Sequence, residues 1–492
     1  MARNKLSIIA VGFVLLLAGC KKDFLDINSD PNRPTASAIT PDLATAAQLN
    51  NSASRNASTY DMFQRYMGYW SASGSFSRST VEMSYNITTG TLAGLFEGTY
   101  YSVSQYRAIG KQAADLNWKF YQGIAKIMEA HEMAILVDFY GDVPYSTAFD
   151  LSGNIRPTYD KGEDIYKALL PLIDTGLAYV KGATGNDANI ATQDIMFKGS
   201  KVDWAKFANS LKLRLLMHTT KVNTFNIPAE IAKIVAEGSG FLGGGLSASV
   251  QPGYTTDKPN PYYSAHLFLS NGNEADTYNR ANNFSLNIMN SLSDPRAQKL
   301  YRPAKTGGAF RGTEYGADPL VANSSDNTSG PGFGPAPLPS SPMWLMTGVE
   351  TMFLIAEATA RGLLAGDPKL AYENAVKESF TFLGLTAAQA TAYLTSSDPR
   401  IAFPAAGTLE QKISTIMWQK YFGLNGIQAN ETYNDWRRLG VVQPPVSVAP
   451  ERGSNQIIRR LLYPASEYSY NAENIKGLGT VTPYSPRVFW DK

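Results

Sequence analysis

The chain has 492 residues, of which 44% are hydrophobic and 17% charged, and its formal net charge is +2 at pH 7. This balance excludes a disordered chain and argues against nucleic acid as a partner, because such partners select a strongly basic surface. Aromatic residues reach 11%, with 27 Tyr and 7 Trp, so we expect a large core and also aromatic contacts for sugar rings or peptide side chains.

Residues 1–19 are predicted to be a secretory signal peptide with a lipobox. Arg3 and Lys5 precede an uncharged, largely apolar run that ends in Leu17-Ala18-Gly19-Cys20. The run is shorter than the roughly 20 residues that a membrane-spanning helix needs. Cys20 is the only cysteine, so we expect cleavage before it and lipidation of its thiol. A buried free cysteine is the less favoured alternative, because the residue follows a signal and lies outside any core.

Two further segments follow the predicted cleavage point. Residues 20–37 are polar and turn-rich, which is typical of a flexible tether between a lipid and a folded body. Residues 38–492 contain no Pro/Ser-rich linker or charge run, so a single domain is predicted. Contact with the membrane is then expected through the lipid alone.

A helix is predicted from about Phe120 to Val137, since apolar residues recur there at helical spacing. His131 lies on the apolar side of this helix. A hydrogen-bonded core histidine is favoured over a catalytic or metal-binding one, because His218 and His266 have no ligand spacing to it.

The segment Asp138-Phe139-Tyr140-Gly141-Asp142-Val143-Pro144-Tyr145 follows that helix. Its two carboxylates could indicate acid/base chemistry or a calcium site. Gly141 and Pro144 mark a tight turn, however, and the backbone groups of such a turn need side-chain partners. A scaffolding role is therefore favoured for this segment.

A second helix is predicted from Trp204, with one buried face. Phe207, Ala208, Leu211 and Leu215 recur on that face. The opposite, polar face carries Lys206, Asn209, Ser210 and Lys212.

Long stretches rich in Gly, Pro, Asn, Ser and Tyr span residues 238–281 and 307–343. Stretches of this length are usually functional or disordered. Aromatic and polar residues that stand together in these and earlier loops are the candidate ligand contacts: Tyr69, Trp70, Ser73, Tyr85, Asn86, Tyr254, Tyr262 and Tyr263. An aromatic face could pack on a sugar ring while Asn86 or Ser73 bonds its hydroxyls, but burial in the core is the more frequent role for Trp70 and for the tyrosines.

A helical hairpin is predicted around residues 349–379. Apolar or small residues recur at helical spacing from Val349 to Leu363 and again from Ala371 to Ser379, and Gly366-Asp367-Pro368 separates the two runs. The hairpin is similar in length to a tetratricopeptide repeat. Glu357, on the buried stripe, is expected to pair with a basic residue.

The cluster Asp435-Trp436-Arg437-Arg438 allows two interpretations. Arginine can clamp a ligand by forking onto carboxylates or stacking on aromatic rings. An internal ion pair with tryptophan packing is the favoured interpretation.

Several blocks of the chain resemble, in order, those of one protein family. The blocks are Asp26-Ile27-Asn28-Ser29-Asp30-Pro31-Asn32, residues 138–145, residues 204–214, Asp294-Pro295-Arg296, Ala356-Glu357-Ala358 with Arg361-Gly362, residues 431–438, and Arg459-Arg460-Leu461-Leu462-Tyr463-Pro464 with Ser466-Glu467-Tyr468. They are similar to the SusD/RagB family of surface lipoproteins from Bacteroidetes, in its SusD-like nutrient-binding branch.

The resemblance implies an all-α dominated fold of tetratricopeptide-like helical repeats with large irregular loops and small β-hairpins on one side. It implies a lid that captures an oligosaccharide or peptide and delivers it to a SusC-like TonB-dependent transporter. It further implies no catalytic residue, no cofactor and no metal, and an outer-membrane location that Lys21-Lys22-Asp23 would direct to the cell exterior.

Two alternatives come from other functional classes. A surface glycoside hydrolase or peptidase would need an acid pair or a nucleophile, and the chain has no HExxH or nucleophile-elbow pattern, although its 42 acidic residues offer many pairs. A helical-repeat scaffold protein would dock other proteins and would lack a small-ligand pocket lined by loop aromatics.

Overall fold

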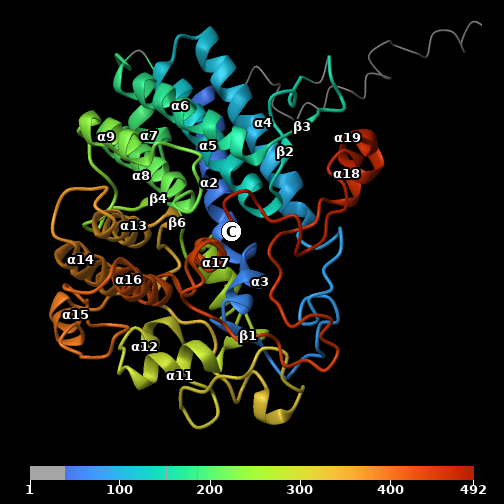
Figure 1. Ribbon diagram of the computed structural model, residues 1–492, viewed down its shortest axis with the longest axis vertical. Coiled ribbons are helices and arrows are strands. Elements are labelled where there is room, and N and C mark those ends of the chain that lie inside the picture. The colour runs from blue at the N-terminus through green and yellow to red at the C-terminus, as the bar shows by residue number, and fades with distance from the viewer. Residues whose placement is uncertain (1–38, 151–152, 186) are drawn as a thin grey trace, which may run out of the picture.

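The computed structural model describes residues 39–150, 153–185 and 187–492, and helices dominate it (Figure 1). The predicted signal peptide, Cys20 and the tether lie outside these residues. The helices are α2 (Pro41–Ser58), α3 (Asp61–Tyr66), α4 (Ala93–Asp115), α5 (Lys119–Tyr140), α6 (Gly162–Lys181), α7 (Ile190–Gln193), α8 (Lys201–His218), α9 (Ile227–Glu237), α10 (Pro261–His266), α11 (Asn283–Ser291), α12 (Ala297–Leu300), α13 (Gly348–Ala360), α14 (Pro368–Phe382), α15 (Ala387–Tyr393), α16 (Leu409–Leu424), α17 (Ala429–Leu439), α18 (Ala465–Tyr470) and α19 (Ala472–Lys476), with a 3₁₀ turn at Val321–Asn323.

Short strands form three antiparallel pairs within the described residues. They are β1 (Trp70–Ala72) with β5 (Asn279–Ala281), β2 (Val143–Pro144) with β3 (Tyr159–Asp160), and β4 (Ala248–Val250) with β6 (Met343–Met346). In the first pair Trp70 lies opposite Ala281. The first and third pairs join loops that are distant in sequence, so these irregular stretches are held in place by backbone hydrogen bonds.

Consecutive long helices pack side by side, as the tetratricopeptide-like prediction requires. Helix α5 lies between α4 and α6, α6 also packs on α8, and α13 packs on both α14 and α16. The helices gather in the upper and left parts of Figure 1, and the loops around β1 and α11 lie below them. The buried apolar side chains of the described residues form one contiguous cluster. Among the described residues, no helix has both the length and the apolar character needed to cross a bilayer.

Two predicted helical segments are confirmed. The helix expected at 120–137 is α5, which continues to Tyr140 and ends at Gly141, where φ is +78°. The hairpin expected at 349–379 is α13 and α14. Thr347 caps the first of these helices by accepting a hydrogen bond from the Glu350 amide, and Asp367 caps the second.

Helix α8 is also confirmed, but the sequence interpretation of its polar face is wrong. Asn209, Ser210 and Lys212 are buried, not solvent-facing. Lys212 reaches Asp174 on α6 at 2.5 Å, and the Asn209 amide donates to Glu237 at 2.7 Å. The polar face is covered because neighbouring segments supply a partner for each of these groups.

The closest approach of α5 and α6 depends on a pair of glycines. A Cβ on Gly123 would lie 2.5 Å from the Gly176 carbonyl oxygen, and one on Gly176 would lie 2.8 Å from the Gly123 carbonyl oxygen. We predict that Gly123→Ala lowers the free energy of unfolding by roughly 1–3 kcal/mol, because the two backbones must separate. Urea unfolding followed by circular dichroism measures this change.

Gly98→Ala in α4 is the matched control. A Cβ at that position would meet no atom within 4 Å. Alanine is the better helix former, so this variant should be more stable than the natural chain by up to about 1 kcal/mol. Equal effects of the two substitutions would contradict the packing argument.

Candidate functional site

Most of the side chains expected to contact a ligand are buried in the core. Six are no more than 5% exposed, namely Tyr69, Trp70, Ser73, Tyr85, Tyr254 and Tyr262, whereas Tyr263 is half-buried and Asn86 is exposed. A ring with no open face cannot stack on a sugar. The expectation of ligand stacking on Trp70 and these tyrosines is therefore corrected, and the alternative of core packing applies in this structure.

The buried aromatics anchor the loops to the helices. The Tyr69 hydroxyl donates to the Tyr421 carbonyl oxygen at 2.5 Å, and the two rings stack with centroids 4.4 Å apart. Trp70 and Tyr262 both pack against the His266 ring, at 4.9 and 5.0 Å. These contacts explain why the loops are rich in aromatic residues without making them ligand contacts.

A groove of about 340 Å³ lies on the loop side, between α11 and two loops. Its lining residues are Asn282, Asn283, Phe284, Asn287, Ile288, Glu314, Tyr315, Pro445, Val446 and Val448. Phe284, Ile288 and Val446 are half-buried, so the groove has a partly apolar surface. Its volume lies within the range typical of small-ligand sites.

Three polar side chains along this groove are uncommitted, whereas Asn282 and Tyr315 are hydrogen-bonded inside the protein. The side chains of Asn283, Asn287 and Glu314 make no hydrogen bond to any other described residue, and Asn287 and Glu314 are exposed. An amide offers both a donor and an acceptor, which suits the hydroxyls of a sugar. The groove therefore combines an aromatic ring with free amide groups.

The loops that carry the candidate residues Tyr69, Trp70 and Tyr85 lie directly behind this groove. A Cβ on Gly68 would lie 2.9 Å from the Phe284 ring, and the Tyr85 hydroxyl accepts a hydrogen bond from the Ser447 amide at 2.7 Å. Sequence reasoning thus selected residues next to this groove but did not select Phe284 or Asn287. The run Asn282-Asn283-Phe284 was the available signal, because an aromatic residue stands there among amides.

A larger cleft of about 690 Å³ lies along α4, beside the segment that joins β2 to β3 and beside α18. Phe96, Tyr100 and Phe149 line it, together with charged side chains. Those charges are mostly committed inside the protein. Arg107 pairs with Glu129 at 2.7 Å, and Glu97 and Glu467 accept hydrogen bonds from Ser466 and Tyr159. The cleft consequently offers a ligand fewer free polar groups than the groove does.

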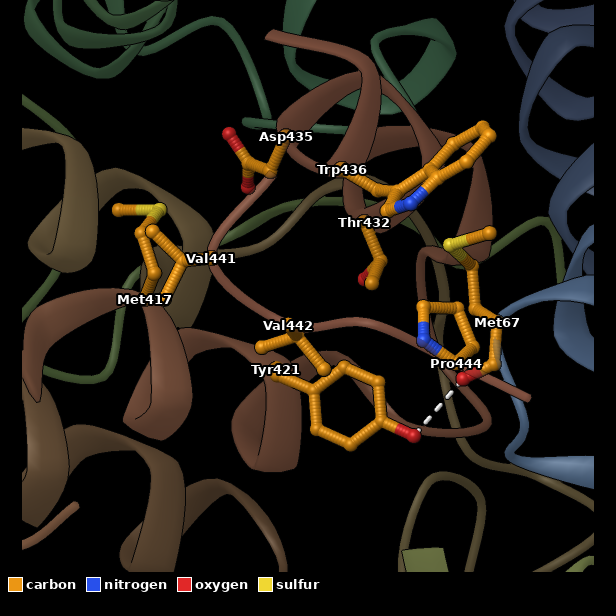
Figure 2. Close-up of a pocket in the computed structure, with 9 residues that line it drawn as sticks. All are labelled: Met67, Met417, Tyr421, Thr432, Asp435, Trp436, Val441, Val442 and Pro444. Atoms are coloured by element: carbon orange, nitrogen blue, oxygen red, sulfur yellow. Dashed lines mark hydrogen bonds between the residues drawn. The ribbon is translucent and has the colours of Figure 1, made fainter. Parts of the chain in front are cut away.

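A third hollow, shown in Figure 2, is too small for a nutrient. It measures about 20 Å³ and lies among Met67, Met417, Tyr421 and Trp436. The Tyr421 hydroxyl donates to the Met67 carbonyl oxygen at 2.8 Å on one side of it. A space of this size holds about one water molecule.

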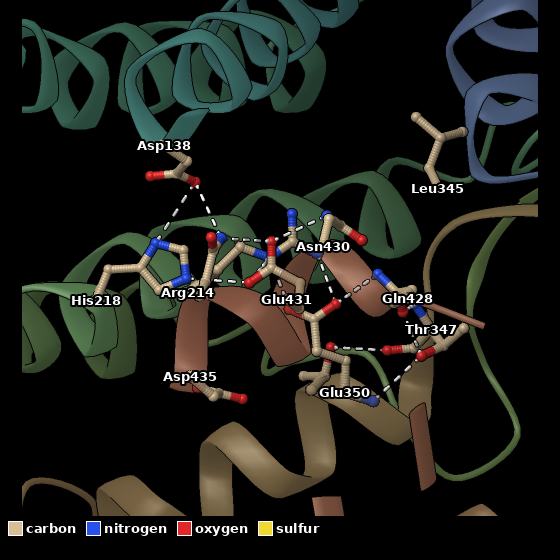
Figure 3. A network of polar contacts seen from close by, with 12 residues as sticks. Asp138, Arg214, His218, Leu345, Thr347, Glu350, Gln428, Asn430, Glu431 and Asp435 are labelled. Atoms are coloured by element: carbon tan, nitrogen blue, oxygen red, sulfur yellow. Dashed lines mark hydrogen bonds and ion pairs between the residues drawn. The ribbon is translucent and has the colours of Figure 1, made fainter. Parts of the chain in front are cut away.

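A buried ionic network joins α5, α8, α13 and α17 (Figure 3). His218 lies 3.0 Å from Glu431 through Nε2 and 3.7 Å from Asp138 through Nδ1. Arg214 forms a two-pronged ion pair with Glu350 at 2.6 Å. Every one of these residues is at most 4% exposed, so the network is internal.

The electrostatics of this network favour a structural role. Burial by itself lowers the pKa of His218, but Asp138 and Glu431 raise it to about 9, so the imidazole is a cation at neutral pH. Asp138, His218 and Glu431 have the spacing of a metal site. The His218 imidazolium lies between the two carboxylates and the Arg214 Nε lies 3.8 Å from Glu431, so these cations already occupy the place that a metal ion would take. The scaffolding role expected for Asp138 is thus supported.

The second polar cluster matches the favoured sequence interpretation. Arg438 forks onto Glu357 at 2.6 and 2.7 Å and also donates to Asp435 at 2.8 Å. The Arg437 guanidinium lies over the Trp490 ring at 4.6 Å. The internal pairing predicted for Glu357 and for the Asp435–Arg438 cluster is confirmed.

His131 is a core residue, as expected, although one part of that expectation is wrong. It is 4% exposed, but its Nδ1 has no hydrogen-bond partner among the described residues. Burial lowers its pKa well below the ordinary value, so the ring is neutral.

Comparisons with known proteins bear on both the fold and the family. A family model described as SusD-like, starch-binding and associating with the outer membrane, matches residues 31–464. The fold is similar to that of a chitin-binding SusD homologue from Flavobacterium johnsoniae, with 22% identity, a TM-score of 0.78, and coverage of 92% of this chain and 98% of that one. It is also similar to a SusD homologue from Bacteroides ovatus, with 21% identity, a TM-score of 0.77, and coverage of 93% and 100%. No curated protein sequence matches the chain.

Proposed function

The chain belongs to the SusD-like family, and on that premise we propose that it captures an oligosaccharide at the cell surface and passes it uncut to a SusC-like TonB-dependent transporter. Proteins of this family associate with the outer membrane and bind ligands without catalysis. A lipid on Cys20 would hold the protein to the membrane through residues 20–37, with the body facing the exterior. A peptide is the alternative ligand class.

The groove beside α11 is the proposed ligand site, and its free amides carry the proposal. Phe284 offers a half-buried ring, and Asn283 and Asn287 offer donors and acceptors that no other described residue uses. This combination is suited to an uncharged sugar, whose rings have apolar faces and whose edges carry hydroxyls. The fold similarity to a chitin-binding homologue supports a glycan in preference to a peptide.

We predict that Phe284→Ala and Asn287→Ala each weaken oligosaccharide binding by roughly tenfold or more, which corresponds to about 1.4 kcal/mol. The first variant removes the stacking surface and the second removes a hydrogen-bonding amide. Calorimetry with a panel of oligosaccharides and mixed peptides measures both effects. The ligand should be recovered intact afterwards, because no bond is broken.

Phe149→Ala in the cleft along α4 is the control, since it removes an aromatic ring of the same kind from a larger hollow than the groove. It should leave oligosaccharide affinity unchanged. Loss of binding in Phe149→Ala but not in Phe284→Ala would move the ligand site to the cleft. If peptides bind at the groove and glycans do not, the ligand class would be a peptide in place of an oligosaccharide.

A further inference from the structure

A pocket of about 160 Å³ next to β5 is lined by an unusual concentration of positive charge. Arg280, Arg302 and Lys305 line it, together with a single carboxylate, Glu274. The remaining lining residues are Phe268, Pro303, Ser325, Thr328 and Gly330. Three cations and one anion give this lining a formal charge of +2.

Glu274 is shared among all three cations. Its Oε1 lies 2.8 Å from Arg302 and 3.3 Å from both terminal nitrogens of Arg280, and its Oε2 lies 2.7 Å from Lys305. Asp326 also approaches Lys305, at 3.2 Å, but it is 63% exposed and lies outside the pocket lining. One partly buried carboxylate does not neutralise three neighbouring cations.

Each of the two arginines has one nitrogen that donates no hydrogen bond to a described residue. Arg280 is 1% exposed, and its Nε has no hydrogen-bond partner among the described residues. The Nη1 of Arg302 likewise makes no hydrogen bond within the described chain, whereas its Nε and Nη2 do. Burial lowers the pKa of Arg280, which is consistent with incomplete neutralisation. A buried N–H group without an acceptor is costly, so an acceptor is expected beside the Nε of Arg280.

The geometry of the pocket is held by the surrounding chain. The Arg302 guanidinium lies 5.2 Å from the centroid of the Phe268 ring, and its Nε donates to the Pro331 carbonyl oxygen at 2.8 Å. A Cβ on Gly330 would lie 2.9 Å from Arg280 and 3.0 Å from Arg302, so a glycine is needed for both guanidiniums to approach the backbone. The two guanidinium groups are therefore positioned before any ligand arrives.

We propose that this pocket binds an oxyanion group, either a sulfate ester or a carboxylate, of an anionic ligand. Guanidinium and ammonium groups recognise both anions through charge-assisted hydrogen bonds. The volume accommodates one such group and not a whole sugar chain. The anion site rests on its own residues and does not depend on the groove beside α11.

Calorimetric titration of the purified protein with sodium sulfate and, separately, with sodium glucuronate tests the proposal, with ionic strength held constant by sodium chloride. We expect one saturable site for at least one of the two anions. Lys305→Ala should weaken that binding about tenfold, and its side chain is 56% exposed, so the fold should tolerate the change. Lys258→Ala removes an exposed lysine outside the pocket and should change nothing.

A third variant is expected to change the anion affinity in the opposite direction. Glu274→Gln removes the carboxylate that competes with the ligand for the three cations, so the folded variant should bind the same anion several-fold more tightly. Sulfate binding alone or glucuronate binding alone would support the site and identify the group that it takes. Three results would overturn the proposal. They are a heat of binding no greater than that of chloride for both anions, an equal loss of affinity in the two lysine variants, and weaker anion binding by Glu274→Gln.

Discussion

Replacing Arg438 with alanine is expected to lower the free energy of unfolding by roughly 3–5 kcal/mol, because a buried two-pronged ion pair is broken and Glu357 keeps only its contact with the more exposed Arg361. The side chains of Arg438 and Glu357 are 0% exposed. Burial raises the pKa of Glu357, but Arg438 and Arg361 outweigh burial and lower it to about 2, so the carboxylate is charged in the folded protein. Urea unfolding at pH 7 followed by circular dichroism measures the loss.

Arg361→Ala is the matched control for this prediction. Arg361 also contacts Glu357, at 2.9 Å, but its side chain is 18% exposed and Glu357 keeps its two-pronged partner without it. A loss below about 1 kcal/mol is expected for this more exposed ion pair. Equal losses of unfolding free energy in the two variants would show that the two-pronged pair with Arg438 does not stabilise the fold more than the exposed pair does.

Stability should fall by ~3 kcal/mol as the pH rises from about 6.5 through about 9, because His218 loses its proton over this range. Its pKa is raised from 6.5 in the unfolded chain to about 9 in the fold by Asp138 and Glu431, against the effect of burial. For a group with a raised pKa, the stabilisation is complete below the unfolded pKa and is lost above the folded one. Deprotonation would leave Asp138 and Glu431 without the cation between them.

Melting curves of the natural protein and of His218→Gln at several pH values between 6 and 10 measure this effect. Glutamine cannot carry the charge, so the variant should be less stable at pH 6.5 and should lack the part of the decline that His218 contributes. His266 also has a raised pKa, through Asp61 and Asp276 and against the effect of burial. It is present in both proteins, so the difference between their curves isolates His218. Parallel curves would show that His218 does not carry the pH dependence.

The helices that hold the site could be predicted because their signals are local. Apolar spacing located α5 and the α13–α14 hairpin, and Asp367-Pro368 marked the start of α14. The pairing of Glu357 could also be expected, since a buried carboxylate requires a cation. Its partner, Arg438, lies 81 residues away and could not be identified from spacing.

The sequence predicted residues next to the candidate site, but not the residues that line it. Tyr85 and Trp70 were correctly seen as aromatic residues in loops, but spacing does not show which face of a ring is covered. Trp70 is enclosed by His266, and the groove is formed only when α11 meets loops near residues 314 and 446. Exposure is a property of the assembled fold, so a local pattern does not determine it.

By itself, the sequence determined the predominantly helical class, the helix positions and the family, because these follow from periodicity and from motifs in order. Only the tertiary structure decided which polar groups are hydrogen-bonded or ion-paired inside the protein and which have no partner among the described residues. Lys212 forms an ion pair and Asn209 a hydrogen bond with neighbouring segments, whereas the side chain of Asn287 and the Nη1 of Arg302 make neither with the described residues. Hydrogen-bond partners are supplied by long-range packing, and for that reason the two proposed binding sites became visible only in the folded chain.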